Sequence, residues 1–117
     1  MSKPARTLFA FGIYVVVVGI GFVVAPAMLM SLLQLPPATA GWARVIGLLA
    51  LVIGAYDIIG ARAECLPYIR ASVYVRVCFA GGCAALVALR QMPMSVLLLG
   101  FVDLAAAVWT ALALKKS

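Results

Sequence analysis

Four charged side chains lie inside long apolar stretches of this 117-residue chain. They are the carboxylates of Asp57 and Asp103 and the guanidinium groups of Arg44 and Arg76. Ionisable groups at membrane depth are expensive, and they usually pair with one another or face a cavity. Such groups can relay a proton or an ion, or can hold the polar head of a ligand. They can equally form neutralising pairs that set the order and register of helices.

Depth along each expected helix suggests two pairs among these four residues. At about 1.5 Å per residue, Asp57 lies roughly 9 Å and Arg76 roughly 6 Å from the middle of consecutive helices, towards the same side, which favours an Asp57–Arg76 pair. Arg44 lies about 10 Å towards the other side. Its long side chain either bends inward to Asp103 or extends to lipid headgroups. We interpret the charges first as structural pairs, and a binding or relay role stays an alternative.

The composition predicts an all-α integral membrane protein. The chain is 68% hydrophobic and 10% charged, whereas soluble domains have about 45–50% apolar and about 25% charged residues. Apolar stretches long enough to cross a bilayer predict transmembrane helices. We expect a single transmembrane domain over residues 1–117, a four-helix bundle with helices at about 7–24, 41–63, 69–89 and 95–114.

The segment at 26–35 is too short to cross the membrane. Pro26 suits a first helical turn, and Pro36-Pro37 would end the helix. We therefore expect a short interfacial helix between the first and second spans. The basic start and Ala25-Pro26-Ala27 together resemble a signal peptide, but the apolar run is longer than such a region usually has, which favours a retained helix.

Small residues recur on one side of the second and fourth expected helices at alternating steps of three and four. Such rows let membrane helices approach closely. They predict a tight bundle with little central volume. The residues expected at helix contacts are Ala43, Gly47, Ala50, Gly54, Ala61, Gly100 and Ala107.

Several kinds of chemistry are not expected. The chain has no histidine, and its three cysteines, Cys65, Cys78 and Cys83, form no Cys-x-x-Cys pair. This argues against a metal site and a Ser-His-Asp centre. We interpret the cysteines as small buried hydrophobic residues, apart from Cys65 in a loop. The basic residues lie at the ends of apolar runs and do not alternate with aromatic residues, so nucleic acid is not an expected partner.

Basic residues also predict the topology. Seven of them lie on the side that holds both termini and two on the other side, which places both termini in the cytoplasm. Trp42, Tyr68 and Trp109 suit interfacial aromatic belts. The lipid bilayer is the first expected partner.

Several segments together resemble the small four-helix bacterial membrane proteins grouped as DoxX-like. They are APAMLMSLLQLPP, GWARVIGLLALVIGAYDIIGARAE, YIRASVYVRV and GFVDLAAAVWTALALKK. The family's Arg and glycines of helix two and its Asp of helix four correspond to Arg44, Gly47, Gly54 and Asp103. The resemblance implies a four-helix bundle in the bacterial inner membrane. Some members are linked to membrane oxidoreductase complexes and to thiol or quinone redox chemistry.

Three functions follow as hypotheses. The first is a non-catalytic accessory or assembly partner that packs against another membrane protein. The second is a redox component that holds a quinone or lipid, with Arg44 and Asp103 at its polar head. The third is a small proton-coupled transporter that acts as a homo-oligomer, with Asp57 or Asp103 titrating, although the first helix lacks the acid that short exporters commonly use.

Overall fold

The computed structural model describes residues 1–35 and 39–116, and these form five helices. They are α1 (Lys3–Val24), α2 (Pro26–Leu32), α3 (Ala40–Arg62), α4 (Leu66–Ala88) and α5 (Val96–Lys116). All but α2 are long and apolar enough to cross a membrane. The all-α, multi-pass architecture expected from the sequence is therefore confirmed, with the short helix between the first two spans.

Three helices have bounds that differ from the expected ones by three residues or more. Helix α1 starts earlier, because the Ser2 side chain accepts a hydrogen bond from the Ala5 N–H at 3.3 Å and caps the helix. Helix α4 starts at Leu66 because Pro67 fits its first turn. Helix α2 ends at Leu32, and Pro36-Pro37, expected to end it, lie outside the described residues.

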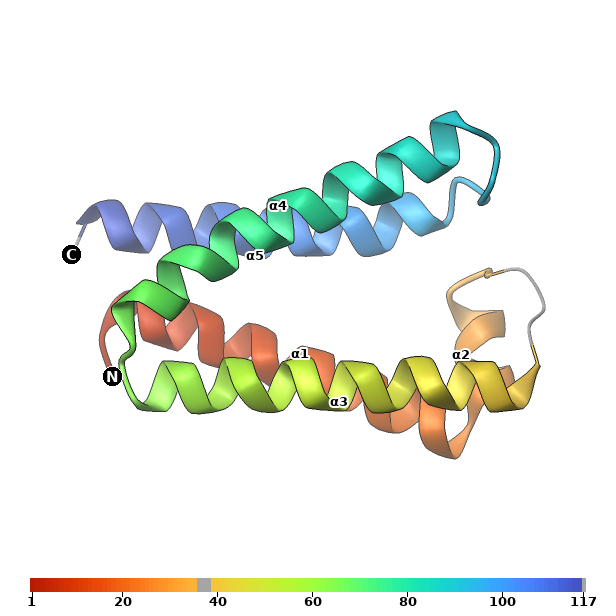
Figure 1. The fold of residues 1–117 in the computed structure, drawn as a ribbon, viewed down its shortest axis with the longest axis horizontal. Helices are drawn as coiled ribbons and strands as arrows, with labels where there is room; N and C mark the ends of the chain where they lie inside the picture. The colour runs from red at the N-terminus through yellow and green to blue at the C-terminus, as the bar shows by residue number, and fades with distance from the viewer. Residues whose placement is uncertain (36–38, 117) are drawn as a thin grey trace.

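The long helices form two antiparallel pairs (Figure 1), α1 with α3 and α4 with α5. Both termini and the α3–α4 turn lie at one end of the molecule, and α2 and the α4–α5 turn lie at the other. Helix α5 also packs against α1 and joins the two pairs. A buried cluster of Ala5, Leu8, Ala61 and Ile69 closes the end that holds the termini.

Glycines set the close approach of α1 and α3. A Cβ atom added at Gly54 would lie 2.6 Å from Val16 Cγ2 and 3.0 Å from the Gly12 carbonyl oxygen. One added at Gly47 would lie 2.7 Å from the Gly19 carbonyl oxygen. The two backbones are therefore in contact, with no room for a larger side chain at these positions.

The other expected contact residues divide between the two helix pairs. Gly100 faces α4, since an added Cβ atom would lie 3.1 Å from Cys83 Cβ. Ala43, Ala61 and Ala107 are buried, whereas Ala50 is half-buried and borders a cavity.

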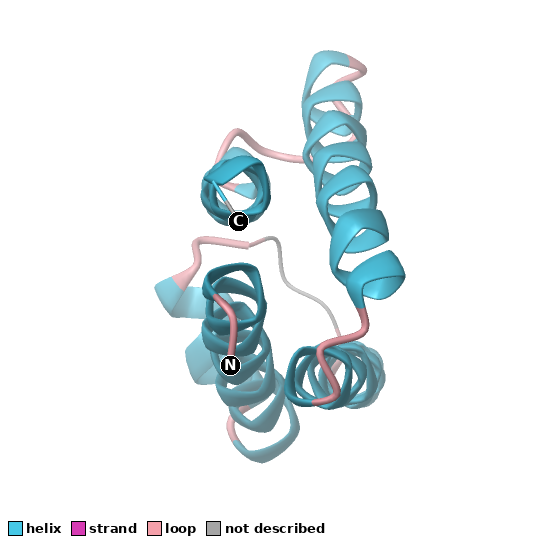
Figure 2. Ribbon diagram, turned by 90° about the vertical axis from the view of Figure 1, so that its left-hand side faces the viewer, coloured by secondary structure: helices cyan, strands magenta, loops and turns pink. Residues whose placement is uncertain are grey.

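Helix α4 diverges from α3 beyond their shared turn (Figures 1 and 2), and it is the least buried of the four spans. Two expectations are corrected here. Cys78, expected to be buried, is exposed on α4, whereas Cys83 is buried against α5. The expected tight bundle with little central volume is also wrong. The divergence of α4 leaves a cavity of about 540 Å³ between the helix pairs.

Candidate functional site

The cavity between the two helix pairs is called the central groove below. It is lined by residues of α1, α3, α4 and α5, and its walls are mainly aliphatic and aromatic. Three of the four charged residues singled out in the sequence line it, namely Asp57, Arg76 and Asp103, which we call the polar cluster. The fourth, Arg44, does not.

Asp57 is buried on α3, with 6% of its surface exposed. One of its carboxylate oxygens accepts a hydrogen bond from the Tyr68 hydroxyl at 2.8 Å. Gly60 makes this contact possible: it lies one turn further along α3, and a Cβ atom there would be 2.7 Å from the Tyr68 ring. The tyrosine ring therefore lies directly across the helix backbone, which brings its hydroxyl to Asp57.

Arg76 is buried on α4 and is held by both α4 and α5. Its Nε donates to the Ser72 carbonyl oxygen at 3.2 Å, and its Nη2 donates to Ser72 Oγ at 3.2 Å and to Thr110 Oγ1 at 2.9 Å. The guanidinium carbon lies 4.8 Å from the centre of the Phe11 ring, which is a cation–π contact. Nη1 is buried without a hydrogen-bond partner among the described residues.

Thr110 extends this network to α1. It accepts a hydrogen bond from the Thr7 hydroxyl at 2.7 Å and donates to the Ala106 carbonyl oxygen at 3.1 Å. Thr7, Arg76 and Thr110 are each at most 4% exposed. A continuous buried hydrogen-bond network thus ties α1, α4 and α5 together beside the central groove.

Asp103 completes the polar cluster from α5. It is half-buried, lines the groove and has no hydrogen-bond partner among the described residues. Its carboxylate is therefore the polar group of the cluster that is most available to a molecule in the groove.

The two expected ion pairs are not formed as direct contacts in the part of the chain described. Asp57 takes Tyr68 as its hydrogen-bond partner, and Arg76 takes Ser72 and Thr110. Both side chains nevertheless line the central groove.

Arg44 lies outside the groove, exposed, and its Nε donates to the Val23 carbonyl oxygen at 3.1 Å. The last carbonyls of a helix lack partners within that helix, so the end of α1 offers a nearby acceptor. Arg44 therefore does not approach Asp103 in the way that the depth estimate allowed.

Two members of the site were not recognised from the sequence as polar partners. Tyr68 was expected only in an aromatic belt, and Thr110 was not assigned a role. A hydroxyl two helical turns from Asp103, in an otherwise apolar segment, is the signal that could have identified Thr110.

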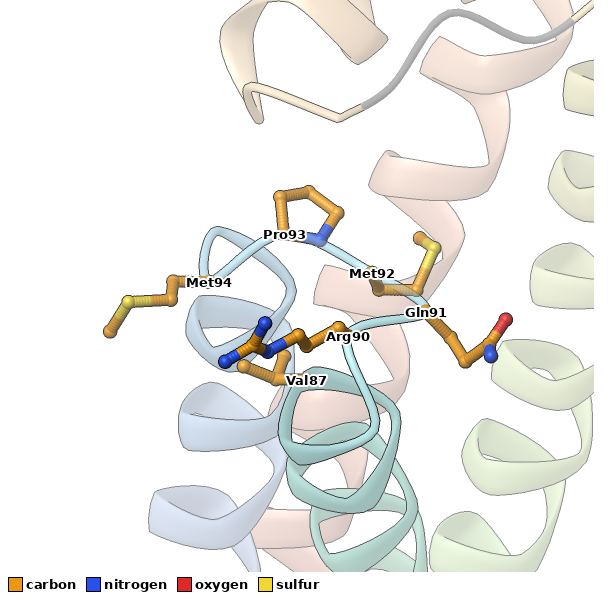
Figure 3. A pocket seen from close by; sticks show the side chains of 6 residues that line it. All are labelled: Val87, Arg90, Gln91, Met92, Pro93 and Met94. Carbon is orange, nitrogen blue, oxygen red and sulfur yellow. The ribbon is translucent and has the colours of Figure 1, made fainter.

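A second hollow, of about 550 Å³, lies at the α4–α5 turn and is open to the surface. Figure 3 shows its lining side chains spread apart, with Gln91 on the opposite side of the turn from Arg90 and Met94. No polar groups converge in it, so the central groove is the better candidate site.

No protein-family model, curated protein or solved structure matches this chain. The fold and the groove define its class as a multi-pass helical membrane protein with a polar cluster on an internal apolar groove.

Proposed function

We propose that this protein is a non-catalytic integral membrane protein that binds an amphiphilic molecule, such as a lipid or a quinone, in the central groove. The observation that carries the proposal is the position of the polar cluster. Asp57, Arg76 and Asp103 come from three different helices and line one apolar cavity. Ligand sites are typically apolar cavities of about 300–1,000 Å³ with a few convergent polar groups, and the groove matches this description.

The shape of the bundle supports an amphiphile in particular. Helices α3 and α4 diverge beyond their turn (Figure 1), and groove residues such as Ile53 on α3 and Val75 on α4 are also exposed. The groove thus opens sideways, at a depth where hydrocarbon chains of the bilayer surround the helices. A chain-like tail fits the apolar walls, and a polar head fits the cluster.

The location that we propose is the bacterial inner membrane, with both termini in the cytoplasm. Support comes from the basic residues, since those at the end of the bundle that holds the termini outnumber Arg44 and Arg90 at the other end. We also propose membership of the DoxX-like group, on the four residues that carry the resemblance, Arg44, Gly47, Gly54 and Asp103. Of these, Gly47 and Gly54 contact α1 and Asp103 lines the groove.

The test fills the groove by substitution. Ala71 lines the groove on α4, whereas Ala84 is exposed on the same helix away from it. Native mass spectrometry of protein released from its own membranes in mild detergent should show a retained amphiphile in the wild type and in Ala84→Trp. The same amphiphile should be absent from Ala71→Trp. Equal retention in both variants, or no retained molecule in the wild type, would contradict the proposal.

A specific observation also favours the accessory role as a second candidate. Side chains added at Gly81 and Gly82 of α4 would meet nothing within 4 Å. A helix face of small residues without a neighbour in the described part of the chain suits contact with another membrane helix. If this role holds, a stable complex with another membrane protein should survive mild detergent, and Gly82→Leu should dissociate it without unfolding the chain.

A further inference from the structure

We propose that the central groove selects a hydrophobic organic cation, with Asp103 as its charged contact. This inference rests on the proposed function, that the groove binds an amphiphile, and adds the chemical class of the ligand. It depends on three features: the charge balance of the polar cluster, the accessibility of each charge and the aromatic lining.

The charge balance of the groove is negative. Its ionisable lining groups other than tyrosines are two carboxylates, Asp57 and Asp103, and one guanidinium, Arg76. With all three ionised, the polar cluster carries a net charge of −1. A charge in a low-dielectric cavity is costly without a counter-charge, so the cluster is stabilised by a cation more than by an anion.

The accessibility of the charged groups also favours a cationic ligand. Arg76 is only 4% exposed, and its Nη1, which has no hydrogen-bond partner among the residues that the structure describes, is covered by protein atoms. Its other two nitrogens are engaged by Ser72 and Thr110. An anionic head would therefore have to displace protein groups to reach the guanidinium.

The two carboxylates differ in how accessible they are to a ligand, and Asp103 is the more accessible one. Asp57 is nearly covered and holds the Tyr68 hydroxyl, whereas Asp103 is half-buried and without a hydrogen-bond partner in the described segments. A molecule that enters the groove therefore meets the Asp103 carboxylate before any positive charge.

Aromatic rings supply the remaining recognition. Phe11, Tyr14, Tyr56, Tyr68 and Phe79 all line the groove. Ring faces attract cations, and the attraction is greatest where water is excluded. Phe11 is already occupied by the Arg76 guanidinium, which leaves four rings for a ligand. Apolar walls, aromatic rings and one uncompensated carboxylate together match a hydrophobic cation.

The test uses two probes of nearly the same shape and opposite charge, tetraphenylphosphonium and tetraphenylborate. Binding of each is measured by isothermal titration calorimetry on the whole chain in a neutral detergent. We expect saturable binding of tetraphenylphosphonium, at least about tenfold tighter than that of tetraphenylborate. Asp103→Asn should weaken binding of the cation by about tenfold or more, since it removes the charged contact.

Glu64→Gln is the matched control, because it removes the same charge outside the groove and should leave cation binding unchanged. Tighter or equal binding of tetraphenylborate would overturn the cation assignment, as would unchanged cation binding in Asp103→Asn. If Asp103→Asn does not fold, the preference of the wild type between the two probes decides the question.

The two proposals fail separately. Loss of the retained amphiphile in Ala71→Trp, together with no preference for the cationic probe, would keep the groove as a binding site and reject the ligand class. No retained amphiphile and no binding of either probe would reject both.

Discussion

Arg76 donates three side-chain hydrogen bonds and makes a cation–π contact beside the central groove. It joins α4 to α5 through Thr110, and to α1 through the Phe11 ring. A planar guanidinium can donate in several fixed directions at once, which an ammonium group cannot do. The position therefore requires arginine in particular and not only a positive charge.

This requirement gives a prediction for Arg76→Lys. The ammonium group cannot reach Ser72 and Thr110 in the same geometry, so buried acceptors lose partners, and we expect a destabilisation of about 1–3 kcal/mol. Thermal unfolding in detergent measures it. Arg70→Lys, at an exposed position of the same helix, should change the stability little. Similar unfolding temperatures for the two variants would show that the Arg76 contacts do not stabilise the fold.

At the scale of elements, the contact between α1 and α3 depends on the absence of side chains. The backbones meet at Gly12 and Gly54 and again at Gly19 and Gly47. Since lipid is as apolar as the helices, close packing is a main source of stability between them. The two helices form a closely packed wall of the central groove, and α4 diverges from it.

The corresponding prediction compares one substitution at two glycines. Gly54→Ala places a Cβ atom 2.6 Å from Val16 and 3.0 Å from a backbone oxygen, and we expect overpacking to destabilise the protein by about 1–3 kcal/mol. Gly81→Ala meets nothing within 4 Å and should stabilise the helix by up to about 1 kcal/mol through higher helix propensity. Thermal unfolding of both variants is the measurement. A destabilised Gly81→Ala would indicate that a partner covers this face.

At the scale of the whole molecule, a hydrogen bond outside the membrane spans connects the residue before α1 to the turn after α3. The Ser2 N–H donates to the Glu64 carboxylate, so the start of α1 is held at the α3–α4 turn. Hydrogen bonds from Ser2 lower the pKa of Glu64 below its ordinary value of 4.5. The turn that places Tyr68 beside Asp57 is thereby tied to the N-terminus.

The lowered pKa predicts a pH dependence of stability. Because the folded-state pKa lies below the ordinary value, the contact stabilises the fold fully above about pH 4.5, and the stabilisation is lost as the pH falls through the folded-state pKa. The unfolding temperatures of the wild type and Glu64→Gln should differ slightly at neutral pH and converge in acid. A difference that stays constant from about pH 7 to about pH 3 would rule out this linkage.

The helical membrane architecture followed from the sequence because it depends on local quantities. The length of an apolar run decides whether a helix can cross the bilayer, and prolines such as Pro26 start or end helices wherever they occur. The small-residue row at Gly47 and Gly54 was likewise visible from periodicity alone, since positions three and four apart share a helix face. Residues 1–117 were thus expected as a helical membrane domain without knowledge of any contact between helices.

The partners of the charged residues were decided by the tertiary structure alone. Depth along a helix brought Asp57 and Arg76 to similar levels, but the rotation of each helix about its axis directs Asp57 to Tyr68 and Arg76 to Thr110. The central groove also depends on the angle at which α4 leaves α3, and Asp103 lines it from a helix distant in sequence. Rotation and divergence are set by packing between helices far apart in the chain, and the periodicity of a single helix carries no information about them.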